Sequence, residues 1–270
     1  MLFQSQVFLL GFLPLTVGLW YGLAARTVAR EWCLLACSLF FYAWWDVRFV
    51  PLLVVQGAAS WLAAEIFQRR GRIARTARTT TPAGTNSAAN ALSIPAGGQS
   101  AGLPDPSRAV LVVAIAANIL VLAFFKYWTF LAQNLFAAVG VHLPQYSIIL
   151  PIGISFFTFE IISYLVDLGW RGAPHYNVRR FGLFVAFFPR LIAGPIVRHN
   201  EIIPQFDLAP MREGLAERLS QGATLLVLGL AKKLYLADAL APLADAAFRA
   251  GVDQTPSLGV AWTGALAFTF

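Results

Sequence analysis

Residues 109–125 read AVLVVAIAANILVLAFF, an apolar run that contains no charged side chain. A helix needs about 20 predominantly apolar residues to cross the hydrocarbon core of a bilayer. The same helix can continue through residues 126–139, so the run is long enough to span. This stretch predicts a membrane helix, so at least part of the fold is expected to be surrounded by lipid.

The composition supports the same conclusion for the whole chain. Of 270 residues, 58% are hydrophobic and only 12% are charged, and the mean hydropathy is +0.66. A soluble domain carries roughly 25% charged residues, which it uses to cover its surface. Aromatic residues reach 14%, which is typical of membrane helices with rings at their ends. A soluble globular fold is therefore excluded.

Other apolar runs flank this helix and predict further spans. They cover residues 7–25, 32–45, 49–67, 148–168 and 219–236. A last run begins near residue 258 and is still apolar at Phe270. It is too short to cross, so we expect the chain to stop inside a helix. The expected fold is an all-α, polytopic transmembrane helical bundle with a broken or re-entrant segment, incomplete at the C-terminus.

The basic residues predict the orientation of these helices. Arg26 and Arg30 follow the first span, and an arginine cluster within residues 69–78 follows the third. Cytoplasmic loops of membrane proteins carry an excess of Lys and Arg. Both loops are therefore expected in the cytoplasm, with the N-terminus outside, in a multi-pass membrane protein; the resemblance given below implies the bacterial inner membrane.

We divide the chain into three parts. Residues 1–67 hold the first three transmembrane helices, residues 68–107 an Arg-rich disordered cytoplasmic loop, and residues 108–270 the transmembrane core. The loop changes from Arg-rich to Ala, Thr, Ser, Gly and Pro, a composition that cannot bury a core. The net charge of +7 raises nucleic acid as a partner. No aromatic residue interleaves the arginines, so no nucleic acid is expected.

One apolar run is interrupted by residues that break helices. Residues 181–197 contain Arg190 beside a proline, followed by Gly194 and Pro195. Broken backbone at membrane depth is tolerated only where protein or a cavity covers the freed polar groups. An arginine there needs a partner or water. The run predicts a broken or re-entrant segment that lines a polar cavity.

The run at residues 148–168 carries two carboxylates. Glu160 and Asp167 are seven residues apart, so they share one helical face with Ser163 between them. These side chains can form a polar track that faces a cavity. Alternatively, Asp167 only ends the helix at the interface and Glu160 satisfies a neighbouring helix. We favour the second interpretation for Asp167 and leave both open for Glu160.

The remaining residues with chemical potential give weaker signals. His142, His175 and His199 lie beside predicted loops and are interpreted as ordinary loop histidines. Cys33 and Cys37 share one helical face, are read as small apolar fillers, and are not expected to form a disulfide. No Ser-His-Asp order, Gly-rich phosphate loop or metal cluster can be assembled. No metal and no bound cofactor are expected. Composition, hydropathy and residue spacing do not distinguish an enzyme from a transporter.

Several motifs resemble a known family. Residues 149–167 read ILPIGISFFTFEIISYLVD and residues 184–197 read FVAFFPRLIAGPIV. Supporting stretches are SLFFYAWW, FFKYW and GLAKKLYLADA at residues 38–45, 124–128 and 229–239. They are similar to the signature stretches of membrane-bound O-acyltransferases, the MBOAT family. The nearest branch is the bacterial one that acetylates alginate and related exopolysaccharides.

The resemblance implies a reaction and its participants. An acyl group, acetyl in this branch, would pass from a cytoplasmic donor such as acetyl-CoA or an acyl carrier to hydroxyls of a cell-surface or exported polysaccharide such as alginate. The implied partners are the lipid bilayer, the acyl donor, the polysaccharide acceptor and a secreted or periplasmic acyltransferase. In the family, an intramembrane histidine activates the acceptor hydroxyl or relays the acyl group.

That histidine is expected beyond Phe270, in a Trp-His context on a downstream helix. None of the three histidines of this chain matches its position, so no catalytic residue is carried over. Residues 108–270 would then be a truncated family core and the chain an N-terminal fragment. We expect it to have no transferase activity alone. The candidate cavity-lining residues are Glu160, Ser163, Arg190, Gly194 and Pro195.

Two other classes of protein compete with this interpretation. The first is a non-catalytic transporter or flippase component of a polysaccharide export system. Transporters often carry broken helices in matching positions of two repeats, and this sequence shows one such segment without a second. A purely structural subunit of a secretion complex would not need Arg190 or Glu160.

Overall fold

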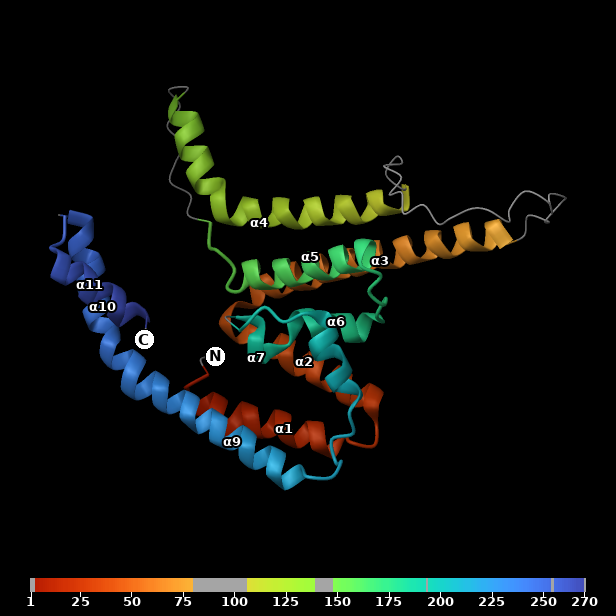
Figure 1. Cartoon of the computed structure of the whole chain (residues 1–270), viewed down its shortest axis with the longest axis horizontal. Helices are drawn as coiled ribbons and strands as arrows, with labels where there is room; N and C mark the ends of the chain where they lie inside the picture. The colour runs from red at the N-terminus through yellow and green to blue at the C-terminus, as the bar shows by residue number, and fades with distance from the viewer. Residues whose placement is uncertain (1–2, 80–105, 139–147, 193, 254, 270) are drawn as a thin grey trace, which may run out of the picture. The chain divides into compact units, whose positions relative to one another are not determined.

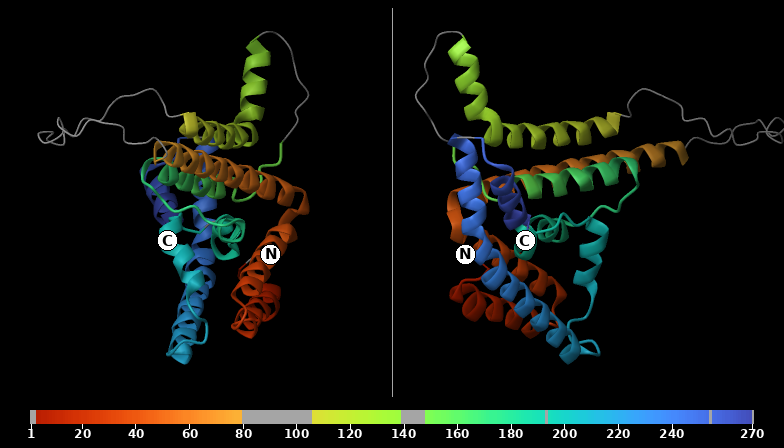
Figure 2. Two further views of the ribbon diagram at one scale, coloured as in Figure 1. Left: turned by 90° about the vertical axis from the view of Figure 1, so that its right-hand side faces the viewer. Right: turned by 60° about the vertical axis from the view of Figure 1, so that its left-hand side comes forward.

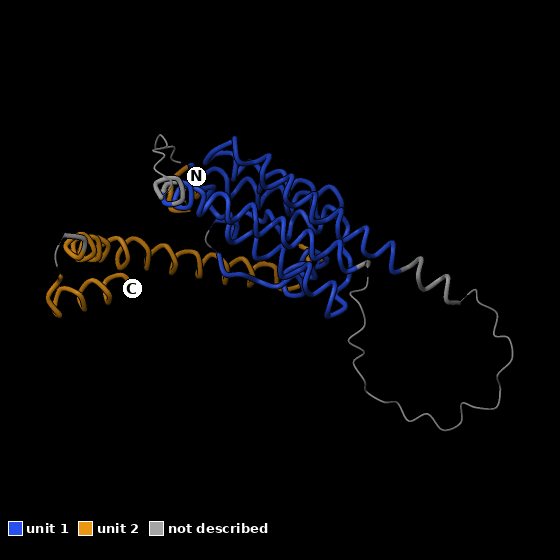
Figure 3. Tube along the Cα trace, turned by 90° about the horizontal axis from the view of Figure 1, so that it is seen from above, with its two compact units in different colours: residues 1, 11–208 blue, residues 2–10, 209–270 orange. Residues whose placement is uncertain are grey.

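The computed structural model describes residues 3–79, 106–138, 148–192, 194–253 and 255–269. Helices dominate these residues, and no β-strand occurs among them (Figure 1). The all-helical prediction is therefore confirmed for the part of the chain that the structure describes. Two compact units are present, Gly11–Leu208 with Met1 and Ala209–Phe270 with Leu2–Leu10 (Figure 3).

The first unit begins with helices that run into one another. After the π-helical turn η1 (Val7–Phe12), the elements are α1 (Leu13–Gly22), α2 (Thr27–Asp46), the short 3-10 turn η2 (Val47–Phe49) and α3 (Val50–Thr79). The Asp46 carboxylate accepts a hydrogen bond from the backbone N–H of Arg48 and so starts η2. Pro51 lies in the first turn of α3, where a missing N–H leaves no backbone bond unmade.

Helix α3 corrects part of the predicted loop. Its last residues, 68–79, carry the arginine cluster and are helical rather than disordered. Arg and Ala are good helix formers, and Arg69 also pairs with Glu65 one turn earlier, Nε to Oε1 at 2.6 Å. Residues 80–105 of the predicted loop lie outside the described residues.

Helices α4 (Pro106–Ala138) and α5 (Ile154–Trp170) pack against α3 (Figure 2). Polar side chains join the three helices in an otherwise apolar interface. Gln56 Nε2 donates to Asn118 Oδ1 at 2.8 Å and to Thr158 Oγ1 at 3.0 Å. Asn118 Nδ2 in turn donates to Ser60 Oγ at 2.9 Å. Within a bilayer the hydrophobic effect does not drive helices together, so hydrogen bonds of this kind help to hold them in contact.

The predicted break in residues 181–197 is present. Helix α6 (Val178–Ala186) ends, α7 (Phe188–Leu191) adds one turn, and the next helix is α8 (His199–Ile202), followed by the 3-10 turn η3 (Ile203–Asp207). Helix α6 packs against α2 and α3. The interruption of the helix is thus observed, whereas a re-entrant path through a membrane stays a prediction.

The start of α5 fits closely against this broken region. Gly153 precedes α5 with φ of +75°, a conformation that favours glycine. A Cβ atom at this position would lie 2.3 Å from the carbonyl oxygen of Leu191. Glycine therefore lets the entry to α5 touch the backbone at the end of α7.

The second unit contains an extended run of helix. Its elements are α9 (Leu215–Ala231), the π-helical stretch η4 (Lys232–Ala237), α10 (Asp238–Asp253) and α11 (Leu258–Thr269). Helices α10 and α11 pack together, with Gly264 so close to Ala247 that a Cβ would approach it to 2.5 Å. The predicted span at residues 219–236 is therefore part of a longer helical run.

Among the described residues, two helices are long and apolar enough to cross a membrane. They are Thr27–Gly71, with hydropathy 1.5, and Arg108–Ala132, with hydropathy 2.5. Val7–Gly22 and Leu258–Thr269 are shorter apolar helices. These findings support a membrane protein, and the larger number of predicted spans and the orientation stay predictions.

Candidate functional site

An ion pair joins α5 to α7 inside the first unit. Arg190 Nη1 lies 2.8 Å from Glu160 Oε1, and the two residues are only 5% and 4% exposed. Each charge would be costly to bury alone. Glu160 is therefore the partner that a buried Arg190 was expected to have. Of the two interpretations left open for Glu160, the structure shows the one in which it pairs with a neighbouring helix, α7.

Arg190 also binds backbone that the helix break leaves free. Its guanidinium donates to the carbonyl of Phe184, through Nη2, and to the carbonyl of Val197, through Nη1 at 3.4 Å. It also lies 4.9 Å from the centre of the Phe184 ring. In an unbroken helix the N–H of residue 188 would bind the Phe184 carbonyl. Here Arg190 takes over that acceptor.

The N–H group freed by the same break is bound from another helix. The backbone N–H of Phe188 donates to Ser38 Oγ on α2 at 3.3 Å. The Ser38 hydroxyl donates to the carbonyl of Leu34 at 2.8 Å. Side chains of α2 and α7 thus satisfy both groups that the interruption exposes, as buried backbone requires.

Gly194 and Pro195 lie directly after the broken segment. The Gly194 N–H donates to the Arg190 carbonyl at 3.0 Å. A Cβ on Gly194 would come within 2.3 Å of both Cα and Cβ of Arg190, so the chain can fold back here only with glycine. Pro195 is exposed, and Ser163 on α5 is half-buried.

The structure separates the two carboxylates of α5. Asp167 is buried and pairs with Arg171 Nη1 at 3.1 Å and with His199 Nε2 at 3.4 Å. Seven residues of helix place it about 10 Å along the axis from Glu160. The two carboxylates therefore serve different partners and do not form one acid–base pair. Asp167 is more than a helix end, because it holds a histidine.

Sequence reasoning missed a polar cluster around that histidine. We call it the histidine cluster, and its members are Glu65, Tyr164, Asp167, His175, Tyr176 and His199. His175 Nε2 lies 2.6 Å from Glu65 Oε2, and Tyr176 Oη lies 3.0 Å from His199 Nδ1. The only sequence signal was that both histidines follow apolar runs near basic residues. The third histidine, His142, lies outside the described residues.

The surroundings of His199 favour its neutral imidazole form. It is 5% exposed, and burial lowers its pKa below the usual value, with the charge of Asp167 opposing that shift. Because Asp167 can only accept, the neutral ring donates Nε2–H to it. Its Nδ1 then accepts the O–H of Tyr176. The neighbours of the ring thus favour the tautomer with its proton on Nε2, in which Nδ1 is the base that faces Tyr176.

A second charged cluster joins α2, α6 and η3. Glu31 is fully buried and binds Arg179 Nε, with Arg180 Nε 3.7 Å away. Arg180 also pairs with Asp207. The neighbouring Arg30 is buried rather than in a loop, and its Nη2 donates to the carbonyl of Phe206 at 2.8 Å. These arginines therefore anchor helices, besides any role in orientation.

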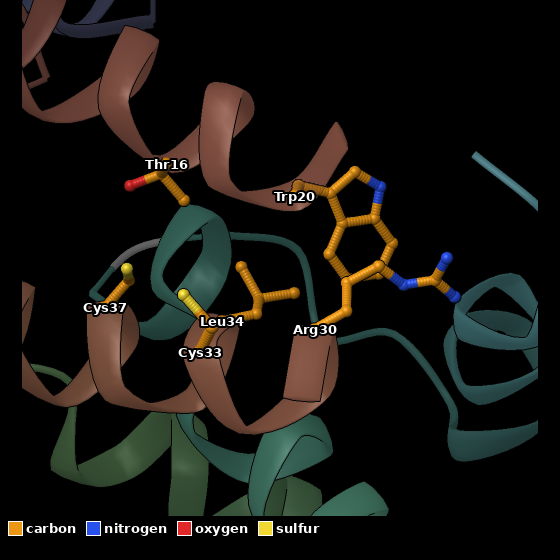
Figure 4. A pocket seen from close by; sticks show the side chains of 6 residues that line it. All are labelled: Thr16, Trp20, Arg30, Cys33, Leu34 and Cys37. Atoms are coloured by element: carbon orange, nitrogen blue, oxygen red, sulfur yellow. The ribbon is translucent and has the colours of Figure 1, made fainter. Parts of the chain in front are cut away.

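Two of the hollows between described residues lie in the first unit. A narrow one lies between α1 and α2, lined by Thr16, Trp20, Arg30, Cys33, Leu34 and Cys37 (Figure 4). It has no room for a water molecule, and both cysteines are free, as predicted. The other is an apolar cavity of about 240 Å³ between α2, α3 and α6. Neither hollow contains the Glu160–Arg190 pair or the histidine cluster.

Comparison with curated proteins finds relatives along the whole chain, and their names describe O-acetylation of alginate or peptidoglycan. These relatives support the family of MBOAT-like O-acetyltransferases, as the motifs predict, and the chain corresponds to part of them. It is 34% identical over 275 residues to the probable alginate O-acetylase AlgI of Pseudomonas syringae. It is 36% identical over 277 residues to the protein of that name in Pseudomonas aeruginosa.

A relative with another acceptor in its name is also similar. The peptidoglycan O-acetyltransferase of Helicobacter pylori is 30% identical over 302 residues. All three comparisons cover 100% of this chain but 46%, 45% and 50% of the relatives. The chain thus spans about half the length of the curated relatives it matches. No family model and no solved structure matches it.

Proposed function

We propose that this chain forms part of a membrane-bound O-acyltransferase that transfers an acetyl group to hydroxyls of an exported polysaccharide such as alginate. The observation that carries the proposal is its 34–36% identity, over its whole length, to probable alginate O-acetylases of two Pseudomonas species. The lower identity of 30% to a peptidoglycan O-acetyltransferase favours alginate-type acceptors.

In this proposal the broken segment forms one wall of a polar passage. Glu160, Ser163, Arg190, Gly194 and Pro195 would line it. The buried pair of Glu160 with Arg190 at 2.8 Å supports this role, because charges within membrane segments mark functional pathways. Gly194 lets the chain fold back beside Arg190.

The remaining participants are also part of the proposal. An acyl donor such as acetyl-CoA enters from the cytoplasm, and the polysaccharide is modified outside. The protein lies in the bacterial inner membrane with its N-terminus outside, and a secreted or periplasmic acyltransferase completes the transfer. The family's catalytic histidine is not assigned to any of His142, His175 and His199. By itself this chain is therefore expected to be inactive toward polysaccharide.

Complementation tests the proposal. The gene, read as far as its frame continues, is expressed in an alginate-producing strain that lacks its own O-acetylase, and ester acetate per uronic acid is measured. Restored O-acetylation is the expected result. Normal expression in the membrane without any ester on alginate would refute the alginate acceptor, and the same assay on peptidoglycan distinguishes the other acceptor.

A further inference from the structure

Tyr176 is held at three points by side chains of the surrounding elements. Its carbonyl accepts the indole N–H of Trp61 at 3.0 Å, and its backbone N–H donates to the hydroxyl of Tyr164 at 3.4 Å. Its own hydroxyl binds His199 at 3.0 Å. The residue lies in the segment between α5 and α6, which no regular helix supports. Three hydrogen bonds therefore hold this loop residue in place, which is more than a segment that only connects two helices requires.

The hydroxyl of Tyr176 ends a line of three functional groups. Asp167 Oδ2 lies 3.4 Å from Nε2 of His199, and the other ring nitrogen lies 3.0 Å from Tyr176 Oη. A hydroxyl bonded to a base, which is in turn oriented by a carboxylate, is the arrangement that activates nucleophiles. Tyr164 packs its ring against both, at centroid distances of 5.8 Å to Tyr176 and 5.5 Å to His199.

Burial distinguishes the members of this line. Asp167 and His199 are buried, whereas Tyr176 is only partly buried. The base and its carboxylate are therefore shielded from solvent, and Tyr176 is the most exposed residue of the three. That distribution suits a nucleophile with a protected base.

We propose that Tyr176 is an acyl-accepting nucleophile, with His199 as its general base and Asp167 as the residue that positions His199. The substrate class is an acyl thioester that carries phosphate groups. The inference rests on the proposed acyltransferase function and adds to it a covalent acyl-enzyme intermediate on Tyr176.

The proposed step balances within the groups named. His199 Nδ1 takes the phenolic proton while the Tyr176 oxygen attacks the thioester carbonyl carbon. A C–O bond forms, the C–S bond breaks, and the departing thiolate takes the proton from His199. The products are an aryl ester on Tyr176 and a free thiol. No oxidant, reductant or metal is required.

Positive charge around the cluster suits this substrate. Burial raises the pKa of the Tyr176 phenol, and the guanidinium of Arg180 opposes that shift, so Arg180 favours the phenolate that forms during attack. Arg171, which pairs with Asp167, has a side chain that is 58% exposed. Its free face can bind phosphate, for which the guanidinium geometry is well matched.

The location agrees with the proposed direction of the reaction. Glu65, in the middle of α3, lies beside His175, which is adjacent to Tyr176 in sequence. Arg69 pairs with Glu65 one turn closer to the C-terminal end of α3. That end of α3 carries the arginines that predict the cytoplasmic side. An activated acyl donor from the cytoplasm would therefore meet Tyr176 before any group deeper in the bundle.

The test uses the purified 270-residue chain in detergent with radiolabelled acetyl-CoA as the probe. Label is located by proteolysis and mass spectrometry. We expect an acetyl ester on the peptide that contains Tyr176, a result that would overturn the expectation from the sequence that the chain alone has no transferase activity. Tyr176→Phe should remove that label, and His199→Gln should slow labelling by about 100-fold, the usual scale of general-base catalysis. Asp167→Asn should slow it as well, and Asp167→Glu should restore part of the rate.

Two controls separate chemistry from misfolding. Tyr235→Phe changes a tyrosine that is 83% exposed and should label like the wild type. Circular dichroism must show that the Tyr176→Phe and His199→Gln variants keep their helix content. Absence of acetyl from Tyr176 in the folded wild type, label on other residues only, or a rate unaffected by His199→Gln would each overturn the inference.

The polysaccharide assay is scored separately. Labelling of Tyr176 together with unmodified alginate would count against the proposed acceptor while leaving the nucleophile in place. Restored alginate acetylation by a Tyr176→Phe variant would leave the proposed function in place and refute the acyl-enzyme intermediate on Tyr176.

Discussion

Arg190 on α7 and Glu160 on α5 form a buried ion pair whose Nη1–Oε1 distance is 2.8 Å. The same guanidinium binds the carbonyls of Phe184 and Val197. One side chain therefore neutralises a charge and completes the backbone hydrogen bonding of a broken helix. A substitution of Arg190 therefore removes the ion pair and the backbone hydrogen bonds together. Its effect on stability should exceed that of losing the ion pair alone.

Removing only the arginine should be costly. Arg190→Met leaves Glu160 buried without a partner, and breaking a buried pair in this way destabilises proteins by about 3–5 kcal/mol. The double variant with Glu160→Gln should recover only part of the loss, because Phe184 still lacks its donor. Unfolding in detergent, read as a double-mutant cycle, measures the coupling. Full recovery in the double variant would show that the backbone contacts contribute nothing.

Gly194→Ala should disrupt the turn after α7. The new methyl group would lie 2.3 Å from two backbone-proximal atoms of Arg190, and overpacking of this kind costs about 1–3 kcal/mol or more. Gly18→Ala is the matched control, because a Cβ at Gly18 on α1 meets nothing within 4 Å. It should be neutral or slightly stabilising, since Ala favours helix. Thermal unfolding of the two variants makes the comparison, and equal shifts would contradict the geometry.

Stability should fall in mildly acidic solution because of His199. Its folded pKa is lowered from 6.5, mainly by burial, with the positive charge of Arg198 adding to the shift and Asp167 opposing it. The unfolded chain therefore binds the proton first, so the contribution is complete above about pH 6.5 and is lost as pH falls through the folded pKa. Melting temperature against pH measures it. A His199→Gln variant should show a flatter curve, and an unchanged curve would contradict the assignment.

The polar bridge between α3 and α4 should contribute a smaller amount. Asn118→Leu removes the acceptor of Gln56 and the donor to Ser60. Interhelical hydrogen bonds in membranes contribute about 0.6–1.7 kcal/mol each. We expect a loss of about 1–2 kcal/mol in detergent, measured by chemical unfolding. Gln221→Leu on α9, where the side chain is exposed, serves as the control and should change little.

Hydropathy and helix-breaking residues predicted much of this structure. The apolar run at residues 109–125 lies within α4, and the proline and glycine of residues 181–197 accompany the observed interruption. These features are local, because hydropathy, proline geometry and glycine sterics act within a few residues. The disordered character assigned to residues 68–79 was wrong, because a charge-rich composition does not distinguish a loop from an exposed helix end.

The partners of the buried charges could be predicted only in part. Arg190 required an acid, but nothing in the sequence selected Glu160 over Asp167, since the choice depends on how α7 meets α5. His199 appeared to be an ordinary loop residue, because its burial results from contacts with Asp167 and Tyr176 far away in sequence. Long-range packing of this kind leaves no periodic signal.

The interruption between α6 and α7 has a mechanical consequence. A proline–glycine break is usually read as a hinge, about which two segments rotate freely. Here Ser38 binds the N–H at the break and Arg190 binds the carbonyl. Rotation would have to rupture both bonds in an apolar medium. We therefore expect this break to be stiffer than one whose backbone groups lack such partners.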